Sequence, residues 1–172
     1  MFNIMKEEEA LDTAPAVEAE TDYETERGKP MPNRVHGAIQ GQINFLLRLA
    51  YNQEYQFPNE VSLDTTPPTT PDICIYPKKK LDWRTTTAKE IEMPLTAIEI
   101  LSPSQSLDEL VAKAEDSYFS EGVKSAWIVV PALKTIIVLL PDEQKLYFTT
   151  GILEDPATGI QIPVEKVFEE LI

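Results

Sequence analysis

The sequence of 172 residues contains one cysteine, one histidine and six glycines, and each low count excludes a class of site. Cys74 alone cannot build a disulfide framework, and His36 alone cannot supply a histidine-rich metal site. The chain has no Gly-rich phosphate loop, Cys-x-x-Cys pair, His-Glu-x-x-His motif or Gly-x-Ser-x-Gly elbow. A Ser-His-Asp triad built on His36 stays formally open, although no pattern places an activated serine beside it. Carboxylates in apolar surroundings are therefore the main candidates for chemistry.

A long uncharged apolar run is also missing. The longest candidate, residues 125–140, is interrupted by Pro131 and Lys134, so we expect no membrane span. The N-terminus has neither the basic region nor the apolar run of a signal peptide. We therefore expect a cytoplasmic protein, in keeping with its unpaired cysteine.

Length and composition favour a single domain. A chain of this size can bury about two thirds of its unfolded surface, so its core needs neither disulfides nor a structural metal. The opening segment is rich in alanine, proline and acidic residues and lacks periodic apolar residues, which is typical of a poorly ordered arm. We expect such an acidic arm over residues 1–20 and one domain over residues 21–172.

Negative charge is concentrated at the N-terminus. The whole chain has a net charge of −14, and residues 1–27 contain nine acidic and two basic residues, a net charge of −7. A solvated tail that aids solubility is the simpler interpretation, and a partner-binding tail is the alternative.

One short segment reverses the sign of the charge. Residues 78–89 hold five basic residues and one acid, a net charge of +4. Such a segment can attract phosphate over about one Debye length, ~8 to 10 Å, while distant acids are screened. A solvated loop is the alternative interpretation. The candidate nucleic-acid contacts are Lys78, Lys79, Lys80 and Arg84.

Hydrophobic periodicity predicts a mixture of helices and strands. Asn33 can cap a helix over residues 34–51, Ser106 and Glu109 form a capping box for a helix over residues 107–121, and Gly122 can end that helix. The other elements are strands at 60–63, 73–76, 95–101, 125–130 and 134–140, a hairpin-like segment at 144–149 and a helix at 164–171. The strands at 125–130 and 134–140 are continuously apolar, as in strands buried on both faces. This order predicts an α/β (α+β) domain in which helices pack on one sheet.

Two carboxylates lie in unusually apolar strands. Glu99 is flanked by Ala97, Ile98 and Ile100, and Asp72 lies at the mouth of the strand over 73–76. A buried carboxylate must neutralise, meet a basic residue or bind a cation. Two acids on adjacent strands supply the hard oxygen ligands that Mg²⁺ prefers. The structural alternative is that Glu99 pairs with a basic residue and Asp72 caps a turn after Pro71.

A metal-dependent hydrolase also benefits from a lysine that positions water and stabilises charge in the transition state. The period of two places Leu101 on the same face as Glu99, where that lysine would be expected. Leu101 cannot serve this purpose. The nearest substitute is Lys113 in the predicted helix, where apolar neighbours suggest an inward-facing border.

Several segments are similar to one nuclease family. Pro71-Asp72, followed by Glu99-x-Leu101 and a downstream helical lysine, resembles the PD-(D/E)xK nuclease superfamily with its lysine migrated. The segments at 23–30, 36–40, 71–73, 97–104 and 122–131 more narrowly resemble the Uma family of restriction endonucleases. The run Glu99-Ile100-Leu101-Ser102-Pro103-Ser104 is the most specific of these, and the similarity extends from Tyr23 to the C-terminus. Leu101 departs from the lysine pattern of the superfamily but agrees with that of the Uma family.

The resemblance implies a restriction-endonuclease-like core, with a central mixed sheet flanked by helices and an N-terminal extension. It implies Asp72 and Glu99 as metal ligands, and Glu26 competes with Glu24 for a further acidic role. His36 matches a histidine of the family and could contact phosphate or cap local structure. The catalytic residues implied are Asp72, Glu99, Lys113 and Glu24.

The function expected from these features is a Mg²⁺-dependent DNA endonuclease, with Mn²⁺ as a substitute metal. A homodimer would let one compact domain address both strands of a duplex. The alternative is a catalytically inactive nuclease-fold module that binds nucleic acid or a protein partner. The net charge of −14 favours this alternative, because duplex-binding proteins usually carry a broader positive surface.

Overall fold

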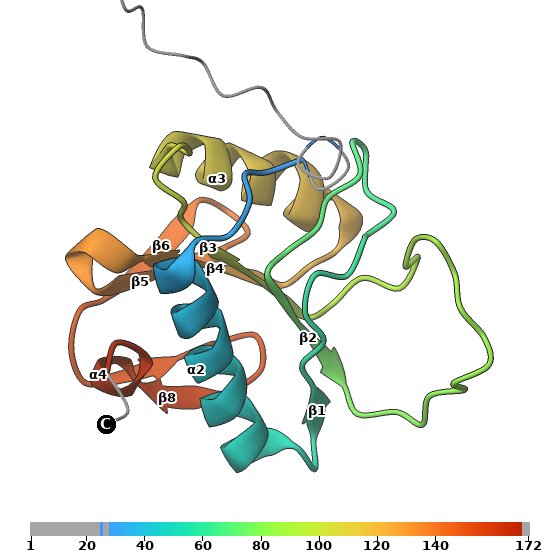
Figure 1. The fold of residues 1–172 in the computed structure, drawn as a ribbon, viewed down its shortest axis with the longest axis horizontal. Coiled ribbons are helices and arrows are strands. Elements are labelled where there is room, and N and C mark those ends of the chain that lie inside the picture. The colour runs from blue at the N-terminus through green and yellow to red at the C-terminus, as the bar shows by residue number, and fades with distance from the viewer. Residues whose placement is uncertain (1–24, 26–27, 170–172) are drawn as a thin grey trace, which may run out of the picture.

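The structure is a computed structural model that describes residue 25 and residues 28–169 (Figure 1). The predicted arm over residues 1–20 lies outside the described residues. Within residues 28–169, no helix has the length and apolar composition that a membrane span needs. The elements in chain order are α2 (Arg34–Tyr51), β1 (Tyr55–Gln56), β2 (Ile73–Pro77), β3 (Thr96–Ile100), α3 (Leu107–Lys113), the π-helix η1 (Ala114–Tyr118), the 3-10 turn η2 (Phe119–Glu121), β4 (Ser125–Val130), the 3-10 turn η3 (Pro131–Leu133), β5 (Thr135–Leu140), β6 (Gln144–Phe148), β7 (Ile152–Glu154), β8 (Gln161–Pro163) and α4 (Val164–Val167).

A six-stranded sheet in the order β1-β2-β3-β4-β5-β6 forms the centre of the fold. Strands β3 and β4 are parallel, with Glu99 opposite Ile128, whereas the other neighbouring pairs are antiparallel. A parallel pair needs a crossover connection, and here α3 with η1 and η2 supplies it. Strands β7 and β8 form a separate two-stranded sheet. The expected mixed sheet flanked by helices is confirmed.

The sheet separates two hydrophobic cores. On one face, Ile39, Ile43 and Leu47 of α2 pack with alternate residues of β2 to β5 and with the β7, β8 and α4 region. On the other face, Leu110 and Tyr118 of the crossover pack with the intervening strand residues. Alternation places Ile98 and Ile100 toward α2, so Glu99 points toward the crossover. This arrangement decides which helix can reach the Glu99 carboxylate.

The crossover begins and ends as the sequence predicts but changes its winding between those points. Ser106 accepts a hydrogen bond from the Glu109 backbone N–H, and the Glu109 side chain accepts one from the Ser106 backbone, which completes the capping box. Gly122 ends the segment in the left-handed region at φ 97°. The predicted continuous helix over 107–121 is instead an α-helix, a π-helix and a 3-10 turn in succession.

Most of the other predicted elements form within a residue or two of their expected bounds. The predicted helix over 164–171 is too long, because α4 ends at Val167 and Phe168 and Glu169 are not helical. The predicted strand at 60–63 is wrong: Glu60 has a φ of 51°, and Leu63 makes only isolated bridges with Thr69 and Glu90. Strand β1 forms just before that segment and was not predicted, and neither were β7 and β8. These strands are two or three residues long, too short to show a period of two.

Asp155 links the N-terminal ends of β3 and β4 through hydrogen bonds. Its buried Oδ2 accepts hydrogen bonds from the hydroxyls of Thr96 and Ser125, at 2.8 Å each, and from Trp127 Nε1 at 3.1 Å. Its Oδ1 accepts one from the Ala157 backbone N–H at 2.9 Å. These uncharged donors satisfy the carboxylate, so Asp155 holds the strand ends and is not a candidate for chemistry.

Candidate active site

The two predicted carboxylates meet where β2 begins and β3 ends. Strands β2 and β3 pair antiparallel with Ile73 opposite Ile98, so Asp72 and Glu99 come from adjacent strands at one end of the pair. Both side chains are buried, at 0% and 2% residue exposure. The Asp72 Oδ2 accepts a hydrogen bond from the Ile100 backbone N–H at 2.7 Å, across the sheet and not within a turn after Pro71. This bond and the backbone hydrogen bond from the Asp72 N–H to the Ile98 carbonyl at 3.0 Å fix the position of Asp72 beside β3.

The ammonium group of Lys29 lies between the two carboxylates. Its Nζ is 2.5 Å from Asp72 Oδ1 and 3.4 Å from Glu99 Oε2. Lys29 belongs to the segment before α2 and is buried. Sequence reasoning missed it as a site residue, although it lies in the 23–30 segment that carries part of the family resemblance. Two buried acids need a nearby cation, and this requirement was the signal that could have pointed to Lys29.

Two residues in the first turns of α2 also contact Asp72. Asn33 caps the helix by accepting a hydrogen bond from the His36 backbone N–H at 2.9 Å. His36 Nε2 lies 3.1 Å from Asp72 Oδ2, and Gln40, one turn later on the same helix face, donates to the Asp72 backbone carbonyl at 2.8 Å. Within the described part of the chain, the buried His36 Nδ1 has no hydrogen-bond partner. The predicted contact of His36 with phosphate stays a prediction.

The crossover holds Glu99. Lys113 Nζ is 3.2 Å from Glu99 Oε1, and the Tyr118 hydroxyl donates a hydrogen bond to the same oxygen. In a π-helix the hydrogen bonds join residues five apart, and this winding brings Lys113 and Tyr118 near one face. The Lys113 side chain retains 19% exposure, whereas that of Lys29 retains 3%. Lys113 is thus the lysine of the cluster that solvent reaches more readily.

Burial and neighbouring charges shift several pKa values in this cluster. Burial alone would raise the pKa of Asp72, but the His36 hydrogen bond and the charges of Lys29 and His36 outweigh it and lower that pKa to about 2. Burial and the Glu99 charge raise the pKa of the Tyr118 hydroxyl, and they do the same for the Cys74 thiol. At neutral pH Asp72 is therefore ionised, while Tyr118 keeps its proton for the hydrogen bond to Glu99.

The donor set fits a hard cation. Asp72 Oδ1 and Glu99 Oε2 both face the position of the Lys29 ammonium, which shows that this position suits positive charge. Among residues 28–169, no cluster of three or more histidine, cysteine or acidic side chains is arranged to hold a metal. Two carboxylates nevertheless suffice for Mg²⁺, which usually keeps water and substrate phosphate as its other ligands.

The basic segment lies at the other end of β2. Lys78 follows the last residue of this strand, six residues after Asp72, which corresponds to about 20 Å of extended chain. Lys79 forms an ion pair with Glu92, and Arg84 Nε lies 3.5 Å from Asp82 Oδ1. The structure therefore places His36 beside Asp72 but does not bring the predicted contacts of the basic segment into the cluster of Asp72 and Glu99. Glu24 lies outside the described residues.

Comparisons with known proteins agree on a nuclease relationship. The model of the Uma2 family, described as "Putative restriction endonuclease", matches residues 9–169. A solved structure described as a "putative nuclease belonging to DUF820" from Anabaena variabilis superposes with a TM-score of 0.66. The two sequences are 21% identical, and the alignment covers 81% of this chain and 83% of that one. At this identity the likeness supports the fold. No curated protein matched the sequence.

Proposed function

Because the chain belongs to the Uma2 family of "Putative restriction endonuclease" proteins, we propose that it is a metal-dependent DNA endonuclease that hydrolyses phosphodiester bonds. The observation that carries the proposal is the convergence of Asp72, Glu99 and Lys113 at one end of β2 and β3. Two ionisable acids and a lysine from three separate elements meet there in a mostly buried position. If these contacts were structural ion pairs alone, neither lysine would need to be accessible to solvent. Lys113 nevertheless keeps 19% of its side chain exposed.

Asp72 and Glu99 would hold Mg²⁺, or Mn²⁺ in its place, through the oxygens that now face Lys29. The bound metal would polarise the scissile phosphate and lower the pKa of the attacking water. His36 and the Ile100 backbone N–H orient Asp72 by binding its other oxygen. The implied role of Glu24 as a further acidic member of the site remains part of the proposal.

Lys113 orients the attacking water or stabilises the negative charge of the transition state. Its partial exposure and its contact with Glu99 Oε1 support this role, because the ammonium can contact a substrate phosphate while it stays anchored to the site. Lys29 has a different role: it balances the two carboxylates before a metal arrives. A homodimer would place two such sites on the two strands of a duplex.

The basic segment after β2 would contact the phosphate backbone and so contribute affinity without sequence information. Lys78 and Lys80 project from an exposed loop, and Arg84 is almost entirely exposed, with a side-chain exposure of 93%. The separation of about 20 Å along β2 means that these contacts would lie several nucleotides from the scissile bond.

One observation favours a second candidate function. Lys29 already neutralises both carboxylates, as in a structural ion cluster, so the fold could serve as a nuclease-like module that binds nucleic acid or a protein partner without cleavage. This module would bind its target equally well with and without Mg²⁺.

Plasmid nicking in Mg²⁺ or Mn²⁺ tests the proposal. We expect cleavage by the wild type and none by Asp72→Asn or Lys113→Ala at unchanged far-UV circular dichroism. Lys145→Ala is the matched control, because Lys145 is an exposed lysine on β6, and it should cleave at the wild-type rate. Unchanged turnover in Lys113→Ala would remove this lysine from the mechanism. Metal-independent DNA binding without nicking by the wild type would favour the binding module.

A further inference from the structure

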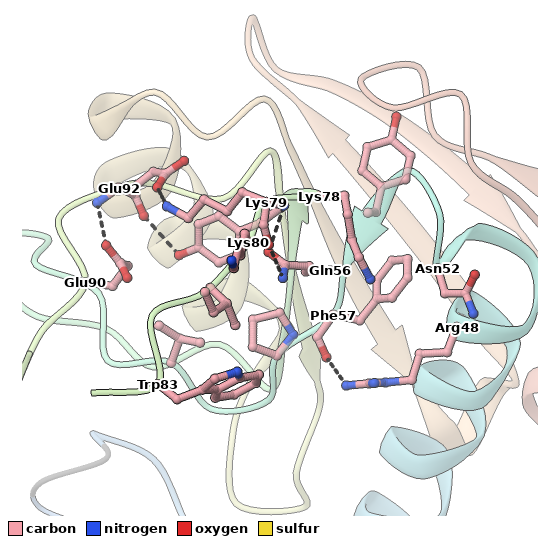
Figure 2. Close-up of a pocket in the computed structure, with 15 residues that line it drawn as sticks. Arg48, Asn52, Gln56, Phe57, Lys78, Lys79, Lys80, Trp83, Glu90 and Glu92 are labelled. Atoms are coloured by element: carbon pink, nitrogen blue, oxygen red, sulfur yellow. Dashed lines mark hydrogen bonds and ion pairs between the residues drawn. The ribbon is translucent and has the colours of Figure 1, made fainter. Parts of the chain in front are cut away.

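A cleft separate from the acidic cluster opens at the other end of β2. It has a volume of about 790 Å³ and lies between the C-terminal end of α2, strand β1 and the loop that follows β2. Figure 2 shows the loop residues Lys80 and Trp83 on the side opposite Arg48 of α2 and Asn52, the residue that follows this helix. This volume is within the range of about 300 to 1,000 Å³ that is usual for ligand sites.

Positive charge predominates around the cleft. Four basic residues and two acidic residues line it, namely Arg48, Lys78, Lys79, Lys80, Glu90 and Glu92. Glu92 forms an ion pair with Lys79, while within the described part of the chain Arg48, Lys78 and Lys80 form no ion pair with a carboxylate. Arg48 is held by uncharged partners, Asn44 Oδ1 at 2.5 Å and the Phe57 carbonyl at 3.5 Å. Three cations therefore remain available to an anionic ligand.

Four aromatic side chains also line the cleft. Tyr55, Phe57 and Tyr76 lie along β1, β2 and the adjoining chain, and Trp83 belongs to the basic loop. Trp83 is 85% exposed, whereas the other tryptophan, Trp127, is fully buried. An indole left in solvent beside lysines can stack on a nucleobase while the lysines bind the adjoining phosphates.

We propose that this cleft binds an unpaired stretch of nucleic acid, with one base stacked on Trp83 and the phosphates on Lys78, Lys80 and Arg48. This inference rests on the proposed function in one respect: the bound strand would be part of the nuclease substrate. A base pair inside a duplex is already stacked on its neighbours and cannot offer its face to Trp83. An acidic peptide would satisfy the cations but would leave the exposed indole of Trp83 without a planar partner.

Tryptophan fluorescence tests the proposal without any cleavage. Oligothymidylate of about ten nucleotides is titrated into the wild-type protein in EDTA, a length within the roughly 4 to 16 nucleotides that a single-strand-binding OB fold covers. We expect saturable quenching, because Trp83 is the exposed indole. An abasic oligonucleotide of the same length should bind about tenfold more weakly or worse, because it keeps the phosphates and loses the stacking. Polyglutamate of equal charge should compete no better than the abasic oligonucleotide, because it also offers charge without stacking.

Two variants separate stacking from general charge attraction. Binding of labelled oligothymidylate by Trp83→Ala, followed by anisotropy, should weaken by about tenfold or more. Leu133→Ala is the control, because Leu133 is 71% exposed and lies in η3, away from the cleft. Both positions are exposed, so neither substitution should affect folding.

Equal affinity for oligothymidylate and its abasic counterpart, or unchanged binding by Trp83→Ala, would overturn the inference. Competition by polyglutamate as strong as that by unlabelled oligothymidylate would do so too, in favour of an acidic peptide. Because the titration contains no metal, quenching without plasmid nicking would leave the cleft standing and reject the endonuclease. Nicking without quenching would reject the cleft alone.

Discussion

At the scale of single residues, Lys29 occupies the position that the proposed metal would take. Its ammonium contacts one oxygen of Asp72 and one of Glu99, the same oxygens that the proposed metal would use. Both carboxylates are buried, so their charges need a cation at all times. A metal at the proposed site would therefore compete with Lys29 for these oxygens, and we expect the lysine to lower the metal affinity.

Lys29→Met removes this competing cation. We expect the variant to lose about 3 to 5 kcal/mol of unfolding free energy without metal, because two buried acids lose a shared counter-charge. Mn²⁺ should then bind more tightly than to the wild type and raise the melting temperature further. Calorimetric titration and thermal unfolding with and without Mn²⁺ measure these changes. Lys113→Met is the control, since it leaves Lys29 in place. If Lys29→Met binds Mn²⁺ no better than the wild type, the two cations do not share a position.

The low pKa of Asp72 predicts how stability depends on pH. Its pKa is about 2 in the folded protein against an ordinary value of 3.8, so the folded state favours the ionised form. This contribution is fully present above about pH 4 and is lost as the pH falls toward 2, because the unfolded chain binds the proton first. Its size is about 2 kcal/mol. Denaturant unfolding between pH 5 and 2 should show that Asp72→Asn lacks this part of the decline, and parallel curves for the two proteins would contradict the assignment.

At the scale of elements, the winding of the crossover decides which side chains reach Glu99. Residues 107–121 predict one helix, and its cap and its stop are confirmed. In a regular α-helix, residues five apart lie about 140° apart around the axis. The π-helical winding at Ala114–Tyr118 brings Lys113 and Tyr118 toward the same carboxylate oxygen. Hydrophobic periodicity does not reveal a single turn of altered winding.

The N-terminal cap of the crossover fixes where the helix that carries Lys113 begins. Ser106→Ala removes the hydroxyl that accepts from the Glu109 backbone N–H at 3.1 Å and should cost about 1 kcal/mol of unfolding free energy. Denaturant unfolding measures the loss. Ser104→Ala is the matched control, because Ser104 is an exposed serine just before the helix, and it should leave stability almost unchanged. Equal stability of both variants would mean that packing of the crossover, and not its cap, determines where the helix begins.

Local signals explain what could be predicted of the fold and site. Helix α2 and strands β4 and β5 carry long apolar patterns, so their positions were predictable. The burial of Asp72 and Glu99 followed from their apolar neighbours. The contact of Lys29 with Asp72 was not predictable, because it joins residues 43 positions apart through a segment with no apolar pattern. Nor does spacing along the chain tell which of two nearby lysines is the more buried.

At the scale of the whole molecule, β2 separates two regions of different chemistry. Its N-terminal end carries the cluster in which Lys29 and Lys113 balance the carboxylates of Asp72 and Glu99. Its C-terminal end leads into the net-positive segment 78–89, which lines the cleft. With a net charge of −14, the protein repels nucleic acid at long range, so binding needs a local attractive surface. The basic loop is well suited to provide it, because screening limits repulsion from distant acids to about a Debye length.

The salt dependence of nucleic-acid binding tests whether this loop provides the attraction. The slope of log affinity against log salt is negative, and each phosphate contact contributes roughly 0.7 to 0.9 to its magnitude. The triple variant Lys78→Glu, Lys79→Glu, Lys80→Glu should therefore reduce that magnitude by about 2. A second triple variant, Lys134→Glu, Lys145→Glu, Lys166→Glu, makes the same change in net charge at exposed positions on β5, β6 and α4 or beside them. Because only the first set adjoins the cleft, only the first variant should flatten the slope. Equal slopes in the two variants would show that total charge, and not this loop, governs the binding.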